Sequence, residues 1–140
     1  MTLFSDGDYM EKRDANQYSP LALAFLGDAV YSQLVRERLL LESNMPVGKL
    51  HSAAVERVCA HYQAQAAELI EPYLTEDEAA VMRRGRNAHT GSGTTPKNSN
   101  PIEYHKATSL EALFGWLELT KAEERKQELF DIIYRQCMSA

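Results

Sequence analysis

The sequence predicts an all-α fold in a single domain, and three observations support this prediction. Apolar residues recur at helical spacing along most of the 140 residues, and no segment shows the alternation typical of a β-strand. Helix-start signals precede several of these periodic segments. The composition, with 44% hydrophobic and 25% charged residues, is that of a globular protein large enough to bury a core without disulfides.

The first long helix is predicted to start at Ser19-Pro20, because serine suits the N-cap and proline the first helical position. We expect residues 1–18 to be a flexible lead-in and residues 19–138 to form the domain. A mostly apolar stretch then continues to a break marked by Asn44, Pro46 and Gly48.

More helices are predicted beyond this break. Residues 50–74 have a helical pattern, as one helix or two, and Thr75 and Glu78 form a capping box that opens the next helix. Gly, Ser, Thr and Asn mark residues 88–100 as a loop. The last two helices are predicted to start at Asn100-Pro101 and at a second capping box, Thr120 with Glu123.

The charge of the chain is unevenly distributed. The net charge is −5, but residues 83–106 carry five basic residues against one glutamate, which gives this segment a net charge of +4. A local basic patch can bind phosphate groups even on an acidic protein. The alternative is a solvated helix end, where basic side chains complement the helix dipole.

A cytoplasmic location is expected. The polar, acidic N-terminus resembles neither a signal peptide nor a transit peptide, and no apolar run approaches the ~20 residues needed to cross a bilayer. Cys59 and Cys137 belong to no CxxC pair, so we expect them to be reduced thiols that serve packing.

Two carboxylates, Asp28 and Glu111, stand on helix faces that should point to the interior. Their helical neighbours at i±3 and i±4 include no Lys or Arg. An unpaired buried carboxylate costs on the order of several kcal/mol, so a compensating partner is expected. Two facing carboxylates with small neighbours suit Mg²⁺. The alternative is that both acids cap other helices or pair with arginines.

These two acids lie in segments that resemble the motifs of ribonuclease III domains. Residues 23–30, LAFLGDAV, resemble the signature E-x-L-E-F-L-G-D-A-V, and residues 107–115, ATSLEALFG, resemble the second motif A-D-A-x-E-A-L-x-G. RGRNA at residues 84–88, followed by GTTPKN at residues 93–98, resembles Mini-ribonuclease III, a subfamily that consists of the catalytic domain alone.

This resemblance implies a ribonuclease III-like helical homodimer. It implies Mg²⁺-dependent hydrolysis of double-stranded RNA, with Mn²⁺ able to substitute, and precursor 23S rRNA as the substrate. Asp28 and Glu111 match the acids that serve catalysis and hold the metal. Leu21, Ala24 and Thr108 stand where full-length ribonuclease III has acids, so fewer charged ligands are expected.

The resemblance also assigns binding residues. Phe25 and Gly27 match positions that pack across the dimer axis, and two symmetry-related sites would account for a cut in both strands. The substrate-binding candidates are basic or amide side chains around the predicted loop: Arg83, Arg84, Arg86, Asn87, Lys97 and Asn98.

Two other functions are compatible with these residues. The missing acids favour a non-catalytic ribonuclease III-like module for RNA binding or dimerisation, whereas the retained Asp28 and Glu111 oppose it. A helical hydrolase acting on small phosphoesters is the third reading, and the basic segment disfavours it.

Overall fold

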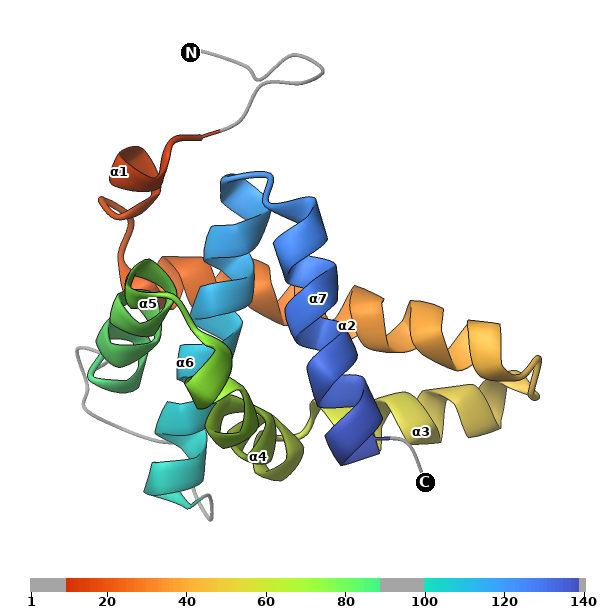
Figure 1. Ribbon diagram of the computed structural model, residues 1–140. Coiled ribbons are helices and arrows are strands. Elements are labelled where there is room, and N and C mark those ends of the chain that lie inside the picture. The colour runs from red at the N-terminus through yellow and green to blue at the C-terminus, as the bar shows by residue number, and fades with distance from the viewer. Residues whose placement is uncertain (1–9, 89–99, 139–140) are drawn as a thin grey trace.

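The computed structural model describes residues 10–88 and 100–138, and these ranges contain helices and no strand (Figure 1). The prediction of an all-α fold is confirmed. The α-helices are α1 (Lys12–Ala15), α2 (Pro20–Glu42), α3 (Val47–Val58), α4 (Ala60–Ile70), α5 (Glu76–Arg86), α6 (Pro101–Leu119) and α7 (Glu123–Ile133). A 3₁₀ turn, η1 (Glu71–Tyr73), and a π-helical turn, η2 (Tyr134–Met138), complete the set.

The crossing of α2 and α6 is the most extensive helix contact in the described chain. Two glycines allow the backbones to touch there. A Cβ atom at Gly27 would overlap the carbonyl oxygen of Glu111, and a Cβ atom at Gly115 would overlap the carbonyl oxygen of Leu23. Any side chain at either position would therefore force the two helices apart, which makes this crossing the rigid centre of the fold.

Aromatic side chains fill the core beside this crossing. Tyr31 of α2 packs edge-on against Phe114 of α6 and Phe130 of α7, with ring centroids 5.3 and 5.6 Å apart. All three rings are buried, and each such pair contributes roughly 0.5–1.5 kcal/mol beyond its area. The core thus joins three helices that are distant in sequence.

An ion pair joins the start of α5 to α7. Thr75 and Glu78 form the predicted capping box, with the Thr75 hydroxyl accepting from the Glu78 backbone and the Glu78 carboxylate accepting from the Thr75 backbone. The same carboxylate accepts two hydrogen bonds of 2.8 Å from the Arg125 guanidinium. The capping box therefore also fixes the contact between two helices.

The lead-in prediction for residues 1–18 is wrong for the part that the structure describes. Residues 12–15 form α1, and Ala15 is fully buried. The backbone of Asn16 accepts from the Arg84 guanidinium at 3.2 Å, and its side-chain oxygen accepts from Arg84 at 3.1 Å and from the Trp116 indole at 3.0 Å. Polar contacts that local periodicity does not reveal thus hold this segment to α5 and α6.

The second predicted capping box is also wrong. The Thr120 hydroxyl donates to the carbonyl of Trp116 at 2.9 Å, so it satisfies the end of α6 rather than the start of α7. The N-cap of α7 is Ala122, which has no side-chain cap.

The segment of residues 50–74, which the pattern allowed as one helix or two, divides at Cys59, which has extended backbone angles. The resulting α3 runs back along α2, and the two project together from the rest of the molecule (Figure 1).

Candidate active site

Asp28 and Glu111 meet where α2 crosses α6. Asp28 follows Gly27, the residue pressed against the Glu111 backbone, so the glycine contact itself brings the two acids together. The Asp28 side chain is exposed, so the prediction that it faces the interior is wrong, while Glu111 is partly buried. The two carboxyl groups share a hydrogen bond. The structure therefore brings together two predicted acids from α2 and α6, which residues 43–100 separate in the sequence.

The environment of Glu111 favours its neutral form. Burial raises the pKa of the Glu111 carboxyl to about 8, and the negative charge of Asp28 and the hydrogen bond to Asp28 add to this rise. A hydrogen bond from Gln63 acts in the opposite direction. Among the described residues no basic side chain contributes to this balance, so the alternative that an arginine neutralises Glu111 is not supported.

Gln63 is a site residue that the sequence analysis missed. It belongs to α4, it is buried, and it hydrogen-bonds Glu111. A signal was present, since Gln63 has only Cys59, Ala60, Ala66 and Ala67 as helical neighbours. The reasoning that singled out Asp28, a polar residue on an apolar face, would have found it.

A divalent cation fits this donor set. Two carboxylates held against each other repel when both are ionised, and a cation between them would relieve that repulsion. Mg²⁺ needs only one or two carboxylates because it retains most of its waters. In the described ranges no group of three or more His, Cys, Asp or Glu side chains is placed to hold a metal ion, so a richer protein ligand set is not present there.

The three positions where ribonuclease III acids are replaced add no charge to the site. Ala24 and Thr108 are buried, and Leu21 is partly buried. The Thr108 hydroxyl donates to the carbonyl of Tyr104 at 3.0 Å within α6, so its proton is already used. The two acids and Gln63 are therefore the polar groups that meet at the crossing.

Comparison with known proteins agrees with this arrangement. A model of the Ribonuclease III domain matches residues 21–122. The Mini-ribonuclease 3 of Brevibacillus brevis is 45% identical over 117 residues, covering 84% of this chain and 86% of its own. The Mini-ribonuclease 3 of Symbiobacterium thermophilum is 47% identical over 110 residues, covering 79% of this chain and 83% of its own. The chain belongs to the Mini-ribonuclease III group of the ribonuclease III family.

A solved structure has the same fold. A crystal structure of a Fusobacterium nucleatum protein superposes with a TM-score of 0.78 at 29% identity, covering 90% of this chain and 99% of that one. The predictions of the family, of the fold and of an endoribonuclease are confirmed. In the described part of this Mini-ribonuclease III, no helix is long and apolar enough to cross a membrane.

The residues predicted to bind the substrate differ in their exposure and in the contacts that they already make. Arg83 and Asn87, at the end of α5, are exposed. Arg84 donates to Asn16, and Arg86 lies 3.8 Å from the Glu71 carboxylate. Lys97 and Asn98 lie outside the described residues. Substrate binding stays a prediction for all six, and it is best supported for Arg83, because Arg84 already has a structural role in this Mini-ribonuclease III.

The two residues predicted for the dimer interface differ in burial. Gly27 is buried inside the chain against α6, so the prediction that it lets a partner subunit approach is wrong. The close approach that the glycine allows is between two helices of one chain. Phe25 is 85% exposed, and its place in an interface stays a prediction.

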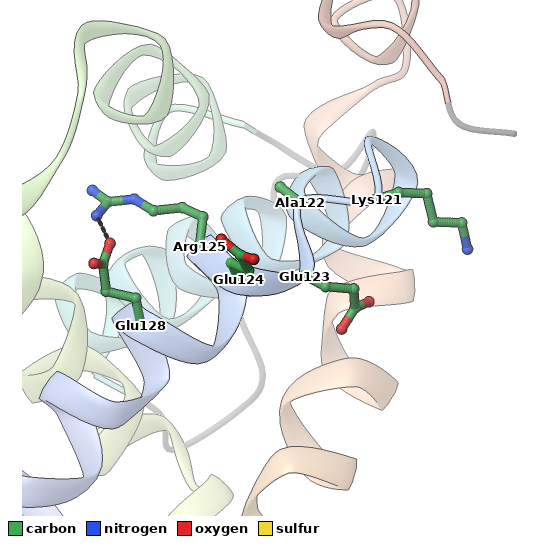
Figure 2. A pocket seen from close by; sticks show the side chains of 6 residues that line it. All are labelled: Lys121, Ala122, Glu123, Glu124, Arg125 and Glu128. Carbon is green, nitrogen blue, oxygen red and sulfur yellow. Dashed lines mark hydrogen bonds and ion pairs between the residues drawn. The ribbon is translucent and has the colours of Figure 1, made fainter. Parts of the chain in front are cut away.

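A surface hollow of about 620 Å³ is lined by residues of the α6–α7 turn and the start of α7. Figure 2 shows that Lys121 points away from Arg125 and Glu128, which are joined as an ion pair. Neither Asp28 nor Glu111 lines this hollow, so it is separate from the candidate active site.

Proposed function

We propose that this endoribonuclease cleaves double-stranded RNA in a Mg²⁺-dependent reaction, as a homodimer. The observation that carries the proposal is the pair of acids, Asp28 and Glu111, held in contact at the glycine crossing of α2 and α6. Membership of the ribonuclease III family supports RNA duplexes as the substrate class.

The roles of the side chains follow from their placement. Asp28, at the exposed side, is positioned to face a bound duplex, while the partly buried Glu111 anchors the site from the interior. Mg²⁺, when bound, would supply charge neutralisation at the phosphate and an activated nucleophile at neutral pH. The backbone contact at Gly27 fixes the spacing between the helices, so the two carboxylates need no rearrangement to act together.

Duplex recognition is assigned to the end of α5. A-form RNA has a major groove too narrow for side chains, so contacts to phosphates and 2′-hydroxyls are expected to dominate. Arg83 and Asn87 are exposed there and have the chemistry for such contacts.

The homodimer is supported by the exposed face of α2. Phe25 is an exposed aromatic residue on the helix that carries Asp28. On the same helix, Leu26, Ala29, Val30 and Leu34 line a hollow of about 470 Å³ whose other walls are polar and charged side chains of α2, α6 and α7. Aromatic residues are enriched at the centres of interfaces, so the exposed Phe25 is the residue of this face best suited to contact a second subunit.

Precursor 23S rRNA is the proposed biological substrate, and maturation of its ends in the cytoplasm is the proposed role. The support is the resemblance to Mini-ribonuclease III in the LAFLGDAV, ATSLEALFG and RGRNA segments, together with the relatives named Mini-ribonuclease 3. These segments carry both acids of the site.

The test is cleavage of a duplex RNA by Asp28→Asn and Glu111→Gln with Mg²⁺ and, separately, with Mn²⁺. Each substitution should lower the rate by about 10³-fold, since a lost carboxylate removes several kcal/mol of metal-dependent stabilisation. Glu42→Gln, which changes an exposed acid at the far end of the same helix as Asp28, is the matched control and should cut normally.

Two results would count against the proposal. A folded Asp28→Asn or Glu111→Gln protein with near wild-type rate would remove these acids from the mechanism. A wild-type protein that binds duplex RNA but does not cut it with either metal would favour the second candidate, a non-catalytic RNA-binding module, which the replacement of acids at Leu21, Ala24 and Thr108 supports.

A further inference from the structure

Gln63 stands out as a buried polar side chain in an otherwise apolar stretch of helix. It is 3% exposed, and the alanines at positions 64, 66 and 67 beside it on α4 are also buried. A buried amide without hydrogen bonds costs about 1–3 kcal/mol. A residue of this kind is retained in a core where its hydrogen bond contributes something that an apolar side chain cannot.

The partner of Gln63 is Glu111. The Glu111 carboxyl has two hydrogen-bond partners, Asp28 of α2 and Gln63 of α4. The helix that carries Gln63 packs directly against α6, which carries Glu111. Asp28 offers only acceptor oxygens when ionised, whereas the Gln63 amide can donate to the Glu111 carboxylate.

We propose that Gln63 is a positioning residue that holds the Glu111 carboxylate turned toward Asp28, so that both acids can face one divalent cation. The inference rests on the proposed function, because it concerns the same site. Gln63 acts through Glu111 and has no direct part in the reaction.

The chemistry of an amide suits this task better than that of a base. A Lys or Arg at position 63 would neutralise Glu111 by an ion pair and so compete with the cation. A glutamine donates a hydrogen bond and adds no charge. It therefore fixes the orientation of the carboxylate while leaving its negative charge for the metal.

The chain offers a matched control two residues away. Gln65 lies on the same helix but is exposed, and its amide lies 3.2 Å from Nε2 of His61 rather than at the acids. Substituting Gln65 changes the same functional group on the same helix without touching Glu111.

The experiment is a calorimetric titration of the RNA-free protein with Mn²⁺, comparing wild type, Gln63→Met and Gln65→Met. Methionine keeps the length and volume of glutamine but cannot donate. We expect Gln63→Met to bind Mn²⁺ about 10-fold more weakly, the effect typical of residues that orient a metal ligand. Cleavage by this variant should require correspondingly more metal, while Gln65→Met should match wild type.

A second variant guards against a misfolded Gln63→Met protein. Gln63→Asn keeps an uncharged amide donor on a shorter side chain. It should bind Mn²⁺ more tightly than Gln63→Met and show a larger rise in Tm on addition of Mn²⁺ than that variant, because part of the hydrogen bond to Glu111 is retained. Circular dichroism of each variant checks folding.

The outcomes distinguish a failure of this inference from a failure of the proposed endoribonuclease function on which it rests. If wild type binds Mn²⁺ and cuts RNA but a folded Gln63→Met protein has wild-type affinity, or Gln63→Asn binds Mn²⁺ no better than Gln63→Met, the inference is wrong and the function stands. If wild type neither binds Mn²⁺ nor cuts RNA, the proposed function and the inference both fail.

Discussion

At the scale of single residues, two glycines determine the geometry of the site. Gly27 and Gly115 lie on opposite helices and each contacts the partner backbone. Asp28 is the next residue after Gly27, and Glu111 supplies the carbonyl that Gly27 contacts. The distance between the two acids is thus set by main-chain packing, which is far stiffer than side-chain packing.

We predict that Gly27→Ala destabilises the protein and lowers its activity. The added methyl group would collide with the Glu111 carbonyl, and overpacking of a core costs about 1–3 kcal/mol. Urea unfolding should show a lower midpoint, and the folded fraction should cut RNA more slowly because the helices have moved apart.

The control for this prediction is Gly48→Ala in α3. A Cβ atom there would meet nothing within 4 Å, and alanine is favoured over glycine in a helix by up to ~1 kcal/mol. This variant should be as stable as wild type or more so. Equal unfolding midpoints for Gly27→Ala and Gly48→Ala would contradict the close backbone contact.

The sequence reveals some of these residues and not others. Asp28 and Glu111 could be found because a charge on an apolar helix face is an anomaly that helical spacing exposes. Gln63 escaped attention because an uncharged amide is a weaker anomaly of the same kind. Gly27 was assigned to the wrong contact, since periodicity shows that a residue faces a packed surface but not which helix provides that surface.

At the scale of helices, the pair of Glu78 and Arg125 joins α5 to α7. Glu78 is 4% exposed, and its carboxylate accepts from both Arg125 and the Thr75 backbone. Burial alone would raise the pKa of Glu78, but the hydrogen bonds and the charge of Arg125 outweigh it and hold this pKa below its ordinary value. The pair also orients α5, whose last turn carries Arg83.

This pair makes stability depend on acid pH. Because the pKa of Glu78 is lower in the folded protein than in the unfolded chain, the ionised carboxylate stabilises the fold above the unfolded pKa of 4.5. That contribution is lost as the pH falls below 4.5 and through the folded pKa. We expect the free energy of unfolding, measured in urea from pH 6 to pH 3, to fall more steeply for wild type than for Glu78→Gln.

The comparison needs a check that the carboxylate itself is responsible. Glu76→Gln, an exposed acid in the same first turn, should leave the pH dependence of wild type unchanged. Parallel pH profiles for wild type and Glu78→Gln would show that the pair contributes nothing to acid stability.

Helix positions were predicted well where the signal is local. Ser19, Thr75 and Asn100 each cap the helix that was expected to follow them, because a cap acts within three residues. Thr120 carried the same pattern, yet it serves the end of α6. A threonine hydroxyl between two helices can donate to a carbonyl in the last turn of the first helix or accept from an N–H in the first turn of the second. Only the geometry of the turn decides between these two bonds.

At the scale of the whole molecule, the proposed homodimer depends on Phe25. We predict that Phe25→Ala weakens dimerisation by about 2 kcal/mol or more, roughly thirtyfold in the dissociation constant, as expected for an aromatic interface anchor. Sedimentation equilibrium at micromolar concentration should show the shift toward monomer, and coordinated cutting of both strands should decline with it.

Leu41→Ala is the matched control for Phe25→Ala. Leu41 is an 82% exposed apolar residue on the same helix, but near its far end. It should leave the oligomeric state unchanged. A wild-type protein that sediments as a monomer, or equal dissociation constants for the Phe25→Ala and wild-type proteins, would refute an interface at this face.

The hydrogen bonds at Asn16 join a segment that precedes the family-matched region to two helices of the domain. The Asn16 side-chain oxygen accepts hydrogen bonds from the Trp116 indole in α6 and from the Arg84 guanidinium in the last turn of α5. Removing the chain through Asn16 would take this acceptor from both donors at once. If the end of α5 contacts RNA as proposed, the Arg84 guanidinium would then be able to turn toward phosphate, so the N-terminal segment would limit how many cations this surface presents.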